Sequence, residues 1–200
     1  MSIDKPKIRL ELFDHNLVKE TSDSFTMEES ISEGYAKIEV HVKNYSILFE
    51  KVDKHVLEFL KLNNCPDFVL FEYKNGQWMP HIFEFKKTIN KKNFEHSKLQ
   101  FLGGIQNALA YAGVLGISLS LEKTILYSVY RNDNISSVSN PAKIRCGMHR
   151  HPEDGQQKAD RKTEQEWDSG CANILFDEYS NFKLKKIKLD VESGEAEYSL

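Results

Sequence analysis

The stretch from Cys65 to Thr88, CPDFVLFEYKNGQWMPHIFEFKKT, constrains the fold more than any other part of the chain. It contains two apolar runs on either side of Asn75-Gly76, a pair typical of a tight two-residue β-turn. The stretch therefore predicts a β-hairpin with strands at Phe68–Tyr73 and His81–Thr88.

The second predicted strand carries charged and aromatic residues in alternation. Because side chains on a strand point to opposite faces in turn, Glu84 and Lys86 share one face and Phe83 and Phe85 share the other. The aromatic face can enter a core while the charged face lines a cleft. Asp67 stands at the start of the first strand, so the hairpin would bring it close to Glu84. A simpler interpretation is the solvated face of an ordinary edge strand.

Two carboxylates and an ammonium group in one place indicate a particular chemistry. Carboxylate oxygens hold hard cations such as Mg²⁺ and leave coordination positions for water. Such a cation polarises a phosphoryl oxygen and acidifies a bound water. The lysine can orient that water or neutralise charge that develops on the phosphate. Phosphodiester hydrolysis needs these parts and no organic cofactor.

The spacing of these residues resembles that of the PD-(D/E)XK nuclease superfamily, which includes restriction endonucleases, Holliday-junction resolvases and RecB-type nucleases. Pro66-Asp67 is followed, after 16 residues, by Glu84-Phe85-Lys86, and the order of elements from Tyr45 to Tyr130 is similar to that of the superfamily. The resemblance implies an α/β fold, a restriction-endonuclease-like central mixed β-sheet flanked by helices. It also implies a Mg-dependent endonuclease that acts on nucleic acid, with DNA preferred over RNA.

The resemblance assigns a role to each motif residue. Asp67 and Glu84 would bind Mg²⁺ or Mn²⁺, and the carbonyl of Phe85 would be the third protein ligand. Lys86 would act on the water or on the scissile phosphate. The alternative function is a catalytically inactive binding or assembly module on the same fold, because fold does not determine function.

Two further positions are candidate accessory residues. Many members of the superfamily add an acid from the first helix, which favours Glu50 over Glu58 on a helix predicted at Tyr45–Leu62. RecB-type members carry a glutamine on the next helix, and Gln106 is the candidate here. Lys98 and Gln100 are its rivals, and exposed surface positions are the simpler interpretation for Glu50 and Gln106 alike.

Hydrophobic periodicity predicts the remaining elements. We expect strands at Ile8–Phe13, Tyr35–Val42, Lys123–Arg131, Ala172–Phe176 and Phe182–Asp190, and a helix at Phe94–Val114, which Gly103-Gly104 would interrupt or break. Residues 15–33 are polar and are expected to include a loop, and the chain ends in a polar tail. Residues 132–170 are predicted to be a long polar loop with one short helix at Arg161–Trp167, within a single nuclease-like domain spanning 1–200.

Composition places few limits on the partners of the chain. The 12 Phe, 8 Tyr and 2 Trp residues suffice for a packed core, and the net charge is −3. A strongly basic protein is excluded, but a local cluster of lysines at Lys87, Lys91, Lys92 and Lys98 predicts a nucleic-acid-binding surface. A solvated loop and helix start would explain the same lysines.

The three cysteines form no disulfide framework, and no apolar run is long enough to span a membrane. A cytoplasmic location is therefore expected. Cys146, His149, His151 and Cys171 suggest zinc only weakly, because their spacing fits no compact finger.

A stripe of small residues, Gly104, Ala108 and Ala112, runs along one side of the predicted helix. Packing on the central sheet is the preferred explanation, and a homodimer seam is the second. A homodimer would also supply two cutting sites for the two strands of a duplex.

Overall fold

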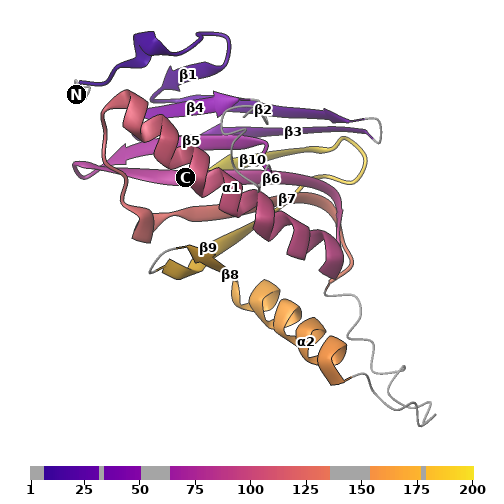
Figure 1. The fold of residues 1–200 in the computed structure, drawn as a ribbon. Coiled ribbons are helices and arrows are strands. Elements are labelled where there is room, and N and C mark those ends of the chain that lie inside the picture. The colour runs from indigo at the N-terminus through magenta and orange to yellow at the C-terminus, as the bar shows by residue number, and fades with distance from the viewer. Residues whose placement is uncertain (1–6, 32–33, 51–63, 136–153, 177–178) are drawn as a thin grey trace.

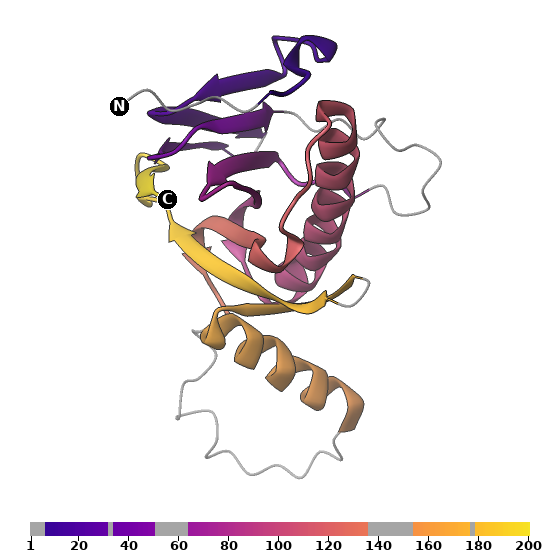
Figure 2. The same cartoon turned by 90° about the vertical axis from the view of Figure 1, so that its left-hand side faces the viewer.

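The computed structural model describes residues 7–31, 34–50, 64–135, 154–176 and 179–200 (Figure 1). In this part of the chain a seven-stranded sheet lies between a long helix on one face and a three-stranded sheet on the other (Figures 1 and 2). The expected α/β class with a mixed central sheet is therefore confirmed.

The elements are as follows. The large sheet has the order β1 (Val18–Thr21), β4 (Ser46–Glu50), β5 (Phe68–Lys74), β6 (Gln77–Ile89), β7 (Ile125–Asp133), β9 (Tyr179–Lys188) and β8 (Cys171–Phe176). The small sheet has the order β10 (Glu195–Ser199), β3 (Gly34–His41) and β2 (Ser24–Ile31). The helices are α1 (Lys91–Leu115) and α2 (Asp154–Ser169), with 3-10 turns at Leu10–Leu12 and Leu121–Lys123. In the large sheet, β7 is parallel to β6 and β9, and the other pairs are antiparallel.

The predicted hairpin is confirmed. Strands β5 and β6 pair antiparallel, with Lys74 opposite Gln77. The two residues between them have positive φ angles, 53° at Asn75 and 78° at Gly76. These angles match the turn that best suits the twist of paired strands, and they explain why asparagine and glycine stand there.

The predicted helix after the hairpin is also confirmed, and it is continuous through Gly103-Gly104. The side chain of Asn90 caps its first turn by accepting a hydrogen bond from the amide of Asn93 at 2.9 Å. Gly116, with a φ angle of 75°, ends it in the left-handed conformation that suits glycine. Because α1 connects β6 to β7, these two strands are parallel, as expected.

Two hydrophobic layers hold the large sheet between its neighbours. One layer joins it to the small sheet and contains Phe83 and Phe85 of β6 with Met27 and Ile38 of β2 and β3. The other layer joins it to the helices and contains Ile82 of β6 with residues of α1 such as Phe101 and Ile105. The alternation predicted for β6 is therefore present, with its aromatic face in the core.

The helix predicted at Tyr45–Leu62 is wrong for its first part. Residues 46–50 form β4, while 51–63, including Glu58, lie outside the described residues. Leu48 packs toward the small sheet, and Ile47 and Phe49 pack toward α1. A strand buried on both faces reads as a continuous apolar run, and periodicity alone cannot distinguish that run from a helix.

The strand predicted at Ile8–Phe13 is wrong: this segment contains a 3-10 turn, and Ile8, Leu10 and Phe13 pack beside α1. Residues 15–33, in which the sequence indicated a loop, also contain β1 and β2. The polar tail contains β10, which pairs parallel with β3. Each of these strands is short or polar on one face, so its pairing depends on partners distant in sequence.

The region 132–170 is more ordered than predicted, because β7 extends to Asp133 and α2 covers Asp154–Ser169. Trp167 attaches α2 to the rest of the fold. Its ring is fully buried in an edge-to-face contact with Phe94, and its Nε1 donates a hydrogen bond to Asp133 Oδ2 at 3.1 Å. One buried tryptophan thus positions a helix that is otherwise polar. Residues 136–153 lie outside the described residues.

The stripe of small residues on α1 packs on the large sheet, as preferred. Gly104, Ala108 and Ala112 are all buried. A Cβ atom added at Gly104 would lie 2.6 Å from Ile82 Cγ2 and 2.9 Å from Pro66 Cγ. The small residues therefore allow the helix backbone to approach the sheet closely. Among the described residues, no helix combines the length and the apolar character that a membrane span requires.

The close approach of α1 gives a test of the packing. We expect Gly103→Ala to destabilise the protein by about 3 kcal/mol, because its Cβ would lie 1.6 Å from the backbone carbonyl oxygen of Asn64. Gly113→Ala is the matched control: no atom lies within 4 Å of its added Cβ, so it should stabilise the helix by about 0.5–1 kcal/mol. Urea unfolding of both variants is the measurement. Equal stability of the two would contradict the packing.

Candidate active site

The site lies at the start of β5, where β6 continues beyond its last residue paired with β5. Pairing between the strands ends at Phe68 and Phe83, so β6 runs on past the start of its neighbour. Asp67 fills the next position with its side chain, because its Oδ2 accepts a hydrogen bond from the amide of Phe85 at 2.6 Å. The carboxylate replaces the missing strand partner, which fixes Asp67 at the edge of the sheet.

Glu84 and Lys86 lie on the face of β6 that is covered by α1. Glu84 follows Ile82 on this face, and its side chain is only 1% exposed. The ammonium group of Lys86, whose side chain is 21% exposed, forms an ion pair with Glu84 Oε1. The other oxygen of Glu84, Oε2, is buried and has no hydrogen-bond partner among the described residues.

Burial raises the pKa values of both carboxyl groups, and the charge of Asp67 raises that of Glu84 further. Burial, followed by the charge of Asp67, raises the pKa of Glu84 to about 8, although Lys86 and Gln100 oppose the shift. Burial also raises the pKa of Asp67 to about 6, against the hydrogen bond from Phe85, and Glu29 adds to this rise. The two acids are therefore electrostatically coupled, and the folded protein resists ionising both of them.

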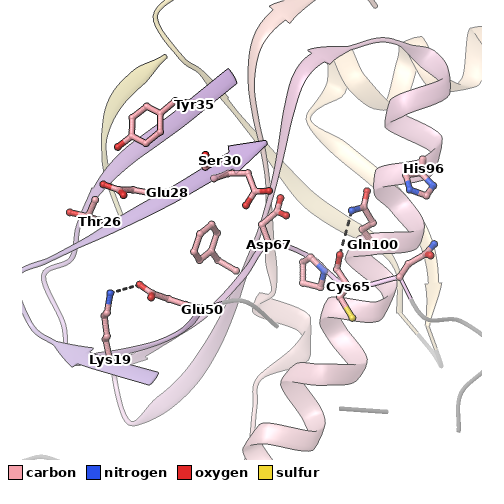
Figure 3. A pocket seen from close by; sticks show the side chains of 14 residues that line it. Lys19, Thr26, Glu28, Ser30, Tyr35, Glu50, Cys65, Asp67, His96 and Gln100 are labelled. Atoms are coloured by element: carbon pink, nitrogen blue, oxygen red, sulfur yellow. Dashed lines mark hydrogen bonds and ion pairs between the residues drawn. The ribbon is translucent and has the colours of Figure 1, made fainter. Parts of the chain in front are cut away.

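Two adjoining cavities open beside these residues. The larger, of about 1260 Å³, lies between the small sheet and α1 and is lined by Asp67 with Glu28, Tyr35 and Gln100, among others. Figure 3 shows Asp67 between the strand that carries Glu28 and the helix that carries Gln100. The smaller cavity, of about 310 Å³, is lined by Asp67, Glu84 and Lys86. The charged face of β6 therefore lines a cleft.

Comparison of the chain with protein-family models, curated proteins and solved structures finds no match. The geometry of this site is therefore the basis for inferring a function.

The residues fit a divalent cation in part. Glu84 Oε2 is a buried acceptor without a partner, and the coupled pair of acids would lose its repulsion if a cation lay between them. Among the described residues, no group of three or more His, Cys, Asp or Glu side chains is arranged to hold a metal ion. Two carboxylates alone suit Mg²⁺, which usually keeps several waters and also binds substrate phosphates.

Of the two accessory candidates, Glu50 lines the larger cavity with Asp67, whereas Gln106 lines neither cavity. Glu50 ends β4, a strand and not the predicted helix, and it forms an ion pair with Lys19 at 2.6 Å in the larger cavity (Figure 3). Gln106 lies on α1 but lines neither cavity. Its rival Gln100 lines both cavities. The six residues between Gln100 and Gln106 amount to about 1.7 helical turns, so the two side chains lie on different sides of α1.

The four lysines of the predicted nucleic-acid-binding surface fall into two groups, one paired with α2 and one exposed. Lys91 forms an ion pair with Glu164 at 2.8 Å, and Lys98 forms one with Glu166 at 2.6 Å, both across to α2. These two lysines help to dock α2, a helix that the sequence only partly predicted. Lys87 and Lys92 are exposed. Lys87 also lines the smaller cavity beside Lys86.

Sequence reasoning missed two charged residues of the cleft. Glu29 on β2 lines both cavities, and its charge acts on Asp67. Arg131 on β7 lines the smaller cavity. Arg131 ended a predicted strand, which was its only signal, whereas Glu29 fell in a polar segment that was expected to include a loop. Of the weak zinc candidates, Cys171 is exposed and the other three lie outside the described residues.

The raised pKa of Glu84 predicts a pH dependence of stability in metal-free protein. The folded state holds the proton more tightly than the unfolded state, whose pKa is near 4.5. This contribution is therefore complete below the unfolded pKa and is lost as the pH rises toward about 8. We expect Glu84→Gln to remove it, so that the variant gains on the order of 2 kcal/mol over the parent between about pH 5 and about pH 9.

Urea unfolding in the presence of a chelator measures this difference. Glu122→Gln is the control, because Glu122 is exposed on the 3-10 turn before β7. It should leave the pH slope unchanged. Parallel curves for Glu84→Gln and the parent would show that burial does not perturb Glu84.

Proposed function

We propose that this protein is a metal-dependent nuclease that hydrolyses phosphodiester bonds of nucleic acid, with DNA as the preferred substrate. The observation that supports it best is the coupled pair Asp67 and Glu84 with Lys86 beside it, at the open end of a mixed sheet. The preference for DNA rests on the resemblance to the PD-(D/E)XK superfamily.

The residues of the site divide the work. Asp67 and Glu84 would hold Mg²⁺ or Mn²⁺, with the Phe85 carbonyl as the third protein ligand implied by the resemblance. The bound cation supplies Lewis-acid polarisation of the phosphoryl oxygen and an acidified water. Lys86 places a positive charge beside this pair, where it would neutralise charge on the phosphate or orient the water. Burial of Glu84 excludes bulk water from one side of the site.

The charges around the smaller cavity suit a phosphate group. Lys86, Lys87 and Arg131 line it, and all three are positively charged at neutral pH. Arg131 offers several donors in a planar fork that matches phosphate oxygens. We therefore propose that the nucleic-acid backbone enters beside these three residues, with Lys92 as a further contact.

The inactive binding or assembly module is the second candidate. It is favoured by the acidic lining of the larger cavity, which includes Glu28, Glu29 and Glu50, and by the pairing of Lys91 and Lys98 with α2. A surface of this kind repels a polyanion. Binding of Mn²⁺ separates the candidates, because an assembly module has no need of a cation at Asp67 and Glu84.

We further propose a cytoplasmic location and a homodimer. The location rests on the cysteine content of the sequence, because three cysteines do not form a disulfide framework. Two copies would supply the two sites needed to cut both strands of a duplex, and symmetric dimers are the commonest oligomers.

If the protein is a nuclease, Asp67→Ala and Glu84→Ala should each lower the cleavage rate at least about a hundredfold. Loss of a metal ligand should lower activity more than loss of a residue that only hydrogen-bonds to a ligand, which typically lowers it about 10–100-fold. Cleavage of plasmid and single-stranded DNA with Mg²⁺ or Mn²⁺ is the measurement. In parallel, saturating Mn²⁺ should raise the melting temperature of the parent by about 5–10 °C and leave both variants unchanged. Glu122→Ala is the control of equal charge. Full activity in Glu84→Ala would refute the assignment.

Lys86→Ala should lower the cleavage rate by about 10²–10³-fold at saturating metal, with little change in the metal concentration that gives half-maximal rate. The reason is that a protonated lysine cannot ligate a cation. Turnover measured across a Mn²⁺ titration separates the two effects. Lys123→Ala, an exposed lysine before β7, removes the same charge far along the sheet. A shift of the metal midpoint alone would disprove the role given to Lys86.

A further inference from the structure

Ser128 on β7 lies next to Glu84 on β6. The two residues are register partners in the parallel pair β6 and β7. Leu126 and Tyr130, two positions to either side of Ser128, belong to the hydrophobic layer under the helices, as does Ile82 beside Glu84. Ser128 and Glu84 therefore point to the same face of the sheet, toward α1.

Both residues are fully buried, and each carries an oxygen without a hydrogen-bond partner in the described part of the chain. These oxygens are Glu84 Oε2 and Ser128 Oγ. The side-chain oxygen of Gln100, which lines the cavity with Glu84, is in the same condition. Such groups are rare because burying a polar group without a partner is unfavourable. Two such groups beside a carboxylate oxygen that also lacks a partner indicate a shared function.

The position of Ser128 makes its hydroxyl informative. Ser128 stands in the middle of a buried strand, between Leu126 and Tyr130, where a valine would pack without an unsatisfied polar group. A hydroxyl can rotate to suit its neighbour and can donate one hydrogen bond. The acceptor beside it in register is the carboxylate of Glu84.

We propose that Ser128 is a positioning residue, whose hydroxyl holds Glu84 Oε2 through one buried water. Lys86 already holds Oε1, so the carboxylate would be fixed by one donor on each oxygen. An ionised carboxylate has about four lone-pair sites, which leaves room for a cation. The consequence for metal binding and cleavage rests on the proposed nuclease function, but the contact between Ser128 and Glu84 does not.

A double-mutant cycle on metal-free protein tests the contact. Ser128→Ala should lower the folding equilibrium constant about tenfold more in the parent than in Glu84→Leu, because the contact is absent in the second background. Ser46→Ala is the control: Ser46 is fully buried and its hydroxyl donates to the Asn44 carbonyl at 3.0 Å. Its effect should add to that of Glu84→Leu. Additive effects for Ser128→Ala would overturn the proposal.

A second pair of variants isolates the hydroxyl from the packing. Ser128→Thr and Ser128→Val have nearly the same shape and differ only in that the first keeps a hydroxyl. Calorimetric titration with Mn²⁺ should show binding about tenfold weaker in Ser128→Val than in Ser128→Thr, and the rate at saturating Mn²⁺ should fall similarly. Equal affinities would overturn the positioning role.

The two proposals fail in distinguishable ways. A parent protein that binds Mn²⁺ without cutting DNA overturns the nuclease, whereas the affinity difference between Ser128→Thr and Ser128→Val still supports the positioning role. A parent that binds no Mn²⁺ overturns the metal site, and the double-mutant cycle then decides whether Ser128 holds Glu84.

Discussion

The structure depends on the pairing of β6, the central strand of the large sheet. This strand is antiparallel to β5 along its first half and parallel to β7 along its second half. Because β7 is parallel to β6, the chain must cross over through α1 to reach it, and α1 then covers the face of β6 toward which Glu84 points. Because β6 extends past the start of β5, its unpaired edge lets Asp67 accept a hydrogen bond from the Phe85 amide. Core, crossover helix and candidate site are thus consequences of one strand that is longer than its neighbour.

The same arrangement has an electrostatic cost. Two carboxyl groups with raised pKa values, one of them almost fully buried and repelled by the charge of the other, destabilise the fold at neutral and basic pH. A purely structural strand would carry apolar residues at positions such as 84 and 128. Groups of this kind are concentrated at functional sites, where a perturbed pKa and an unsatisfied oxygen prepare a group for a ligand. This cost, more than the motif, distinguishes Glu84 from an ordinary acid on the face of an edge strand.

The sequence predicted what depends on local signals. The turn residues Asn75-Gly76, the alternation along β6 and the periodicity of α1 were sufficient for the hairpin and its crossover. The helix predicted over β4 failed because a strand buried on both faces lacks alternation. β10 pairs with β3 through Glu195 and Lys37, which are too far apart in the sequence for any local pattern to indicate. Glu29 was missed for the same reason, because only the packing of the small sheet brings it to Asp67.

The small sheet therefore decides what the candidate site can accept. The resemblance predicted a central sheet flanked by helices, but β2, β3 and β10 cover the face opposite α1 (Figures 1 and 2). Residues of β2 and β3 line the cleft on this side. This wall of the cleft is acidic at Glu28 and Glu29, whereas the side formed by β6 and β7 is basic at Lys86 and Arg131. A phosphate backbone would be attracted to the basic side and repelled by the acidic wall. If the protein cleaves nucleic acid, this asymmetry orients the strand in the cleft, and it does so through residues that no local motif contains.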